Sequence, residues 1–66
     1  MKNSLKVERA IKNITQEELA REIGVTRQAI NSIELGKFVP STVLALRLSK
    51  FFDKTVNDLF SLEEGD

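Results

Sequence analysis

Four side chains between residues 27 and 32 carry hydrogen-bonding groups that match the edges of base pairs: Arg27, Gln28, Asn31 and Ser32. A guanidinium can donate to the two acceptors of guanine, and a primary amide can both donate to and accept from adenine. Ala29, in the same segment, is small enough to contact the methyl group of thymine. No acidic residue occurs from Val25 to Ile33, so no carboxylate opposes the phosphates. The segment predicts a surface that reads double-stranded DNA through these four side chains.

A helix-turn-helix would present this segment to DNA. Residues 15–23 predict one helix, because Thr15 and Glu18 have the spacing of a capping box and Gly24 suits a tight turn. Thr26 predicts the cap of a second helix over residues 27–34. A short helix, a turn with glycine and a second helix form the motif. Its packing positions hold residues of suitable type: Leu19, Ala20, Ile23, Gly24, Val25, Ile30 and Ile33. The alternative is a hairpin in a generic helical bundle.

The start of the first of these helices predicts a phosphate contact. Thr15 and Gln16 lie where main-chain N–H groups are free and the helix dipole is positive, which favours an anion. The first turn of the second helix would enter the major groove, as recognition helices do.

Three further helices and a tail complete the expected all-α fold of five helices. One spans residues 3–13, is capped by Asn3 or Ser4, and has an imperfect apolar stripe: Leu5, Val7, Ala10, Ile11 and Ile14. Another follows Ser41, and its apolar face is Val43, Leu44, Leu46, Leu48, Phe51 and Phe52. A short helix opens at Thr55, with Asp58 in the capping-box position. A strand in residues 61–66 is only weakly signalled. We expect one domain over residues 1–62 and an acidic tail over residues 63–66.

Composition excludes several classes of function. The 66 residues contain no cysteine and no histidine, which removes disulfides, thiolate metal sites and the commonest general base. No pair of carboxylates, lysines or serines is framed by a glycine-rich loop, so we expect no enzyme, no metal site and no cofactor. No apolar run approaches the roughly 20 residues of a membrane span. The first ten residues lack the apolar centre of a signal peptide. A cytoplasmic protein is therefore expected.

The distribution of charge is compatible with DNA, although the formal net charge is zero. Three of the ten acidic residues are Glu63, Glu64 and Asp66, in the tail. Residues 1–62 therefore hold ten basic and seven acidic residues. Charge alone is equally compatible with a generally solvated surface.

Residues 15–41 closely resemble the Cro/C1-type (XRE) helix-turn-helix family of phage repressors and bacterial regulators, and the resemblance covers about residues 5–62. It implies a five-helix, lambda-repressor-like domain that binds operator DNA as a dimer, with residues 27–34 as the recognition helix. It implies that Gln16 braces Gln28. It also implies which residues contact the DNA backbone: Thr15, Gln16, Thr26 and Lys37.

The resemblance also implies a structural ion pair between Arg9 and Glu34. One position departs from the family: Glu8 stands where an aliphatic residue is usual. This departure puts in doubt how the first helix packs, and Val7 or Ile11 could compensate. In close relatives a short terminal strand pairs the chain ends, which the segments "MKN" and "FSLEE" could do here.

A homodimer is expected for a physical reason as well. One recognition helix reads only a few base pairs, whereas two copies related by a two-fold axis read two half-sites and join their affinities. The apolar residues expected at the interface are Val56, Phe60 and Leu62, and the alternative is that these residues close the core of the monomer. The function expected is a transcriptional regulator that acts as a repressor. An alternative of another class is a protein-interaction module, such as an antitoxin with a toxin partner.

Overall fold

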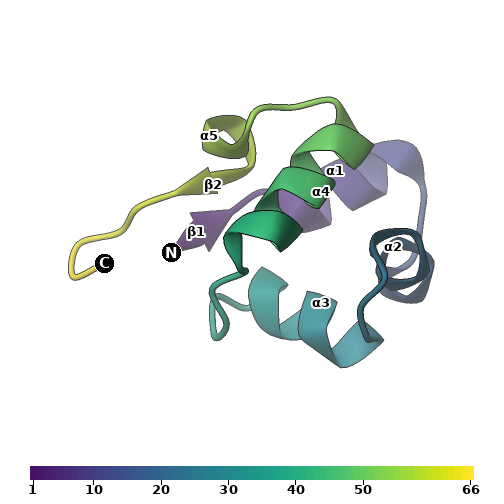
Figure 1. The fold of residues 1–66 in the computed structure, drawn as a ribbon, viewed down its shortest axis with the longest axis horizontal. Helices are drawn as coiled ribbons and strands as arrows, with labels where there is room; N and C mark the ends of the chain where they lie inside the picture. The colour runs from purple at the N-terminus through teal and green to yellow at the C-terminus, as the bar shows by residue number, and fades with distance from the viewer.

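The computed structural model describes residues 1–66 as five helices joined by short loops, with a small sheet formed by the chain ends (Figure 1). The expected all-α class of five helices is confirmed, and a two-stranded sheet accompanies the helices. None of the helices has both the length and the apolar character needed to cross a lipid bilayer. The elements in chain order are β1 (Lys2–Asn3), α1 (Leu5–Lys12), α2 (Gln16–Ile23), α3 (Arg27–Glu34), α4 (Thr42–Phe52), α5 (Val56–Leu59) and β2 (Phe60–Ser61).

Hydroxyl side chains fix the starts of four helices: Thr15 for α2, Thr26 for α3, Ser41 for α4 and Thr55 for α5. Each hydroxyl accepts a hydrogen bond from the main-chain N–H three residues later, at 3.0 to 3.2 Å. These bonds satisfy donors that a helix start leaves without an acceptor. α1 begins differently, because Ser4 makes no such bond and the side-chain oxygen of Asn3 accepts from the N–H of Leu5 at 3.2 Å.

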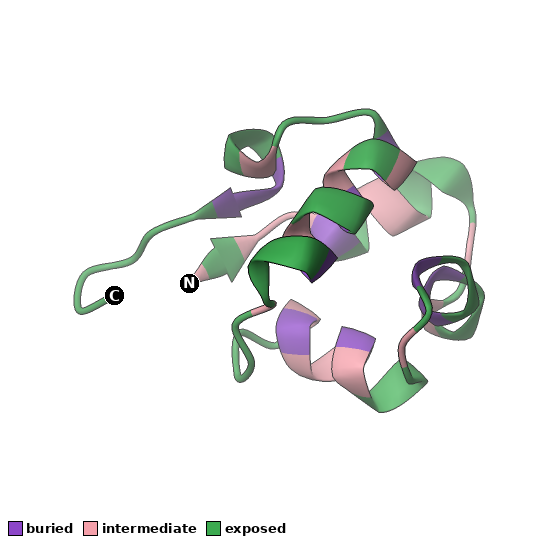
Figure 2. Ribbon diagram, viewed as in Figure 1, coloured by how far each residue is buried: buried purple, intermediate pink, exposed green.

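One apolar core, drawn from all five helices and β2, holds the molecule together, and no polar or charged residue is buried in it. The buried positions lie on the inward sides of the helices (Figure 2). The core residues are Leu5, Leu19, Ala20, Ile23, Ile30, Ile33, Leu44, Leu48, Phe52, Leu59 and Phe60.

Five apolar residues expected on inward faces are instead exposed: Val7 at 59%, Ala10, Ile11 at 71%, Val43 at 59% and Leu46 at 57%. Successive residues of a helix are turned by about 100°, so Leu44, Leu48 and Phe52 share the inward side of α4. Val43 and Leu46 fall on its opposite side. The same holds for α1, where Leu5 points inward and Val7 and Ile11 point outward. Val7 and Ile11 therefore do not supply the apolar packing that an aliphatic residue in place of Glu8, which is half-buried, would provide.

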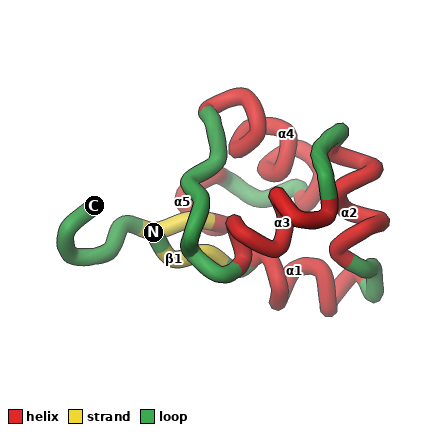
Figure 3. The backbone as a smooth tube through the Cα atoms, turned by 90° about the horizontal axis from the view of Figure 1, so that it is seen from below, coloured by secondary structure: helices red, strands yellow, loops and turns green.

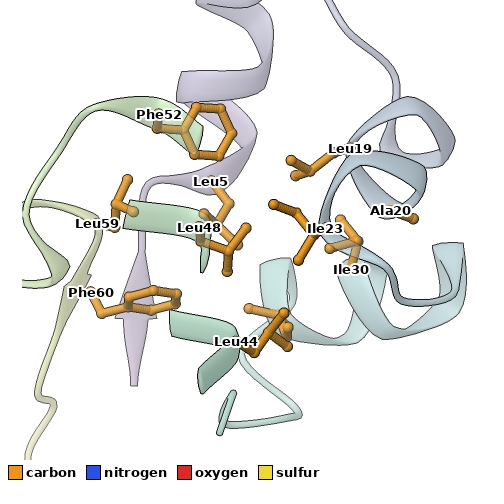
Figure 4. Packing of buried hydrophobic residues seen from close by; sticks show 11 residues of the cluster. Leu5, Leu19, Ala20, Ile23, Ile30, Leu44, Leu48, Phe52, Leu59 and Phe60 are labelled. Carbon is orange, nitrogen blue, oxygen red and sulfur yellow. The ribbon is translucent and has the colours of Figure 1, made fainter. Parts of the chain in front are cut away.

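The turn between α2 and α3 has the geometry of the expected helix-turn-helix (Figure 3). Gly24 ends α2 with a φ of +85°, and its N–H donates to the carbonyl oxygen of Ala20 at 2.8 Å. A β-carbon at this glycine would meet only a side-chain nitrogen of Arg47, at 3.8 Å. The left-handed backbone, rather than lack of space, therefore requires glycine here. Figure 4 shows Ile23 of α2 beside Ile30 of α3, which joins the two helices across the core.

The sheet joins the two ends of the chain. β1 and β2 are antiparallel, with Lys2 opposite Ser61 and Asn3 opposite Phe60. The terminal strand pairing that the resemblance implied is therefore present. The side chain of Asn3 also donates to the carbonyl oxygen of Ile33 at 2.7 Å, which fastens this sheet to the last turn of α3.

Candidate nucleic-acid interface

The exposed part of α3 is its first turn (Figure 2). Arg27 and Gln28 are exposed, while Ala29, Asn31 and Ser32 are half-buried. Residues four apart share one side of a helix, so Arg27 and Asn31 form one pair and Gln28 and Ser32 form another. The four residues predicted to contact bases therefore divide between the two flanks of one helix.

The flank that carries Arg27 faces the start of α2. A surface hollow of about 530 Å³ lies there, and its lining includes Arg27, Thr15 and Gln16. The structure therefore brings a residue predicted to contact bases next to two residues predicted to contact phosphate.

The other flank of α3 faces the loop that follows it. A hollow of about 370 Å³ is lined by Thr26, Gln28, Ala29, Ser32, Lys37 and Phe38. The main-chain N–H groups of Lys37 and Phe38 donate to the carbonyl oxygen of Ser32, at 2.9 and 3.3 Å, and hold the loop against α3. Phe38, which is 50% exposed, was not expected at the site. The feature of the sequence that could have indicated Phe38 is its position as a large apolar residue directly after Lys37.

The start of α2 offers two main-chain donors. The N–H groups of Gln16 and Glu17 have no acceptor within the chain. The N–H of Thr15 donates instead to the carboxylate of Glu18 at 3.0 Å, and this bond is the main cause that lowers the pKa of Glu18. The main-chain donors at this helix start are therefore those of Gln16 and Glu17, and Thr15 can contribute only its hydroxyl hydrogen.

A chain of hydrogen bonds links α1 to α3. Arg9 donates to both carboxylate oxygens of Glu34, from Nε to Oε2 at 2.6 Å and from a terminal nitrogen to Oε1 at 3.0 Å. The side-chain nitrogen of Gln16 donates to Glu34 Oε1 at 3.0 Å and to Asn31 Oδ1 at 3.1 Å. The ion pair implied by the resemblance is thus present. Gln16, however, braces Asn31 and not Gln28, because Asn31 is on the flank of α3 that faces α2.

The charges in this chain are well shielded from water, with 15% of the Arg9 side chain and 6% of the Glu34 side chain exposed. Burial is the largest influence on the pKa of Glu34 and raises it. The hydrogen bonds from Arg9 and Gln16, with the positive charges of Arg9 and Lys6, outweigh burial and keep that pKa below its usual value. The hydrogen bond to Glu34 raises the pKa of Arg9. Both groups are therefore charged at neutral pH.

A family model described as "Helix-turn-helix" matches residues 5–59, which is most of the chain. The chain belongs to the helix-turn-helix family. The resemblance of residues 15–41 to the Cro/C1-type (XRE) members is thereby confirmed. Helix-turn-helix proteins of this kind are DNA-binding transcriptional regulators and not enzymes, so the coarse function of the chain is regulation of transcription.

The chain is similar to helix-turn-helix regulators from both archaea and bacteria. It is 48% identical over 66 residues, the whole of both chains, to an HTH-type transcriptional regulator of Methanocaldococcus jannaschii. It is 47% identical over 64 residues, or 97% of each chain, to the HTH-type transcriptional regulator YgzD of Bacillus subtilis. It is also 45% identical over 53 residues to the HTH-type transcriptional activator BcrR of Enterococcus faecalis, a match to 80% of this chain and 26% of BcrR.

The residues expected at the dimer interface of this helix-turn-helix chain are less exposed than the sequence indicated. Phe60 is 7% exposed and lies in the core, because its ring points inward from β2 toward Leu44 and Leu48 (Figure 4). Val56 is half-buried and packs against the core. Leu62 is 79% exposed. Of the three residues, Leu62 is therefore the one whose side chain is free to meet a second copy, and the dimer itself stays a prediction.

Proposed function

We propose that this helix-turn-helix chain is a sequence-specific repressor that binds a palindromic operator as a homodimer, with α3 in the major groove of each half-site. The observation that carries the proposal is the exposed first turn of α3, where Arg27 and Gln28 stand between two sets of residues predicted to contact phosphate. A recognition helix needs this arrangement, because phosphate contacts fix its register while its first residues read bases.

Arg27 and Gln28 are the main base-reading residues. The guanidinium of Arg27 can donate to both O6 and N7 of guanine, and the amide of Gln28 can pair with N6 and N7 of adenine. Ser32 is on the same flank as Gln28 and adds a hydroxyl that can donate or accept. Ala29 and Phe38 line the hollow beside Gln28 and give this flank an apolar part.

Phosphate contacts fall on both flanks of α3. On one flank, the free N–H groups of Gln16 and Glu17 point outward at the positive end of α2. On the other flank, Lys37 supplies a positive charge and lines the same hollow as Thr26. The hydroxyls of Thr15 and Thr26 accept from the main chain but keep their own hydrogen, which each can donate to a phosphate oxygen.

Two copies would read half-sites about 34 Å apart, one helical turn of DNA. Leu62, the exposed one of the three expected interface residues, is where the two copies would meet. Occupation of a promoter by such a dimer blocks transcription, which makes repression the simplest outcome. The similarity to BcrR, whose name describes an activator, favours activation as the second candidate. A reporter gene driven by the selected operator, with and without the protein, distinguishes the two.

Selection from random DNA duplexes with the purified protein tests the proposal. We expect an inverted repeat to be enriched, and its affinity to fall steeply as salt rises from about 50 to 200 mM, because each neutralised phosphate releases counterions. Arg27→Ala and Gln28→Ala should each weaken operator binding by about 1–3 kcal/mol and relax one base position. Both side chains are exposed, so circular dichroism of the variants should match the wild type. Enrichment of no sequence by the wild type would refute the proposal.

A further inference from the structure

We propose that Asn31 acts on DNA only as a hydrogen-bond donor and therefore selects guanine, because the chain of bonds from Arg9 fixes the orientation of its amide. This inference rests on the proposed role of α3 in the major groove. It differs from the expectation that an asparagine here pairs with adenine, which requires both ends of the amide.

The orientation of each amide in the chain follows from Glu34. An ionised carboxylate only accepts hydrogen bonds, so the end of the Gln16 side chain that lies 3.0 Å from it must be the NH2 group. That nitrogen also lies 3.1 Å from Asn31, and its remaining hydrogen needs an acceptor. The atom of Asn31 that faces Gln16 must therefore be Oδ1.

The nitrogen of Asn31 is left for a ligand. No group within the chain accepts a hydrogen bond from it, and the protein has no buried side-chain nitrogen or oxygen without a partner. The NH2 group of this half-buried residue therefore reaches solvent from the flank of α3 next to Arg27. What Asn31 presents outward is two donor hydrogens and no acceptor.

The major-groove edges of the four bases respond differently to such a group. Guanine presents two adjacent acceptors, N7 and O6, and both can receive a hydrogen from one NH2 group. Adenine presents N7 beside its own N6 donor, which opposes a second donor, and cytosine presents a donor. Thymine presents one acceptor, O4, so guanine is the best match.

The residue that fixes the orientation of the Asn31 amide, through Glu34 and Gln16, is Arg9 of α1. Arg9 holds both oxygens of Glu34 and also donates to the carbonyl oxygen of Ile14 at 3.0 Å. With 6% of its side chain exposed, Glu34 has little freedom to turn toward water. Arg9, Glu34 and Gln16 are therefore positioning residues for Asn31, although none of them needs to touch the base that Asn31 reads.

The test repeats the selection from random duplexes with two variants. Asn31→Ala should lose preference at one position of each half-site, which identifies the base that Asn31 reads. The wild type should prefer guanine to adenine there by about tenfold. Gln16→Met keeps a side chain of similar length but removes the donor, so the Asn31 amide can turn. Its preference at that position should move toward adenine.

The controls separate this inference from a merely structural role and from the proposed function. Gln28→Ala should relax a different position and leave the guanine unchanged. The inference is overturned if the wild type prefers adenine at the Asn31 position, if Asn31→Ala changes no position, or if Gln16→Met weakens all duplexes equally without a change in base preference. Failure of the wild type to select any sequence would instead refute the proposed function, on which the inference rests.

Discussion

At the scale of single residues, Glu34 joins three helices. It belongs to α3, accepts two hydrogen bonds from Arg9 of α1, and accepts a third from Gln16 of α2. Removal of this shielded carboxylate would destabilise the fold, because the guanidinium of Arg9 would remain unpaired in a site with little water. Glu34 therefore stabilises the fold and, through Gln16, also orders the side chain of Asn31.

We expect Glu34→Gln to lower the free energy of unfolding by about 2 kcal/mol at neutral pH, between the values for exposed and fully buried ion pairs. Because the pKa of Glu34 is lowered in the folded protein, the ionised carboxylate stabilises the fold above the unfolded-state pKa. That contribution is lost as pH falls through the folded-state pKa. Urea unfolding at several pH values should show the difference between the two proteins shrink as pH falls below the usual glutamate pKa of about 4.3.

Glu64→Gln is the matched control for this measurement. Glu64 is exposed and makes no hydrogen bond or ion pair within the chain, so its substitution should leave stability unchanged. If Glu34→Gln destabilised the protein by the same amount at every pH, ionisation of Glu34 would not be the source of its stabilisation.

At the scale of helices and turns, local chemistry decides where each element begins and stops. The hydroxyl caps of α2, α3, α4 and α5 involve residues only three apart in sequence, and Gly24 ends α2 through its own backbone conformation. Such features need no information from the rest of the fold.

We expect Gly24→Ala to destabilise the protein by about 1–2 kcal/mol, because an alanine is strained at a φ of +85°. In a domain of this size, that should lower Tm by several degrees. The control is Gly65→Ala, at a φ of +96° in the exposed tail, outside every helix and strand, where no atom lies within 4 Å of the added carbon. Equal effects of the two substitutions on thermal unfolding would contradict this account.

The same local character explains which parts of the structure could be predicted from the sequence. The helix starts, the glycine turn and the positions of Arg27 and Gln28 on the first turn of α3 follow from neighbouring residues. The outward positions of Val7 and Val43 do not follow from neighbouring residues, because packing against the other helices determines which side of a helix is buried. The partner of Gln16 was missed for a related reason: it depends on how α3 is rotated against α2.

At the scale of the whole molecule, the C-terminal part contributes both to the core and to the surface. Leu59 and Phe60 are buried, and two residues later Leu62 is exposed. Substitutions on either side of this boundary should therefore have different consequences, which distinguishes a residue that holds the fold from one that contacts a second copy.

We expect Phe60→Ala to lower the free energy of unfolding by about 3 kcal/mol, as large-to-small changes in a core do. Leu62→Asp should leave unfolding of the monomer nearly unchanged, yet weaken self-association and operator binding together, since a charge would be buried between copies. Urea unfolding and sedimentation measure the two effects. An unaltered dimer with Leu62→Asp would place the interface elsewhere, for example on the exposed side of α4.

The pairing of β1 with β2 also has a practical consequence for handling the protein. Both ends of the chain emerge side by side, across the molecule from the first turn of α3 (Figure 1). A fluorophore, bead or fused reporter attached at either end would therefore leave the proposed DNA-reading surface on α3 unobstructed. For the same reason, a short linker could circularise the chain without stretching any helix.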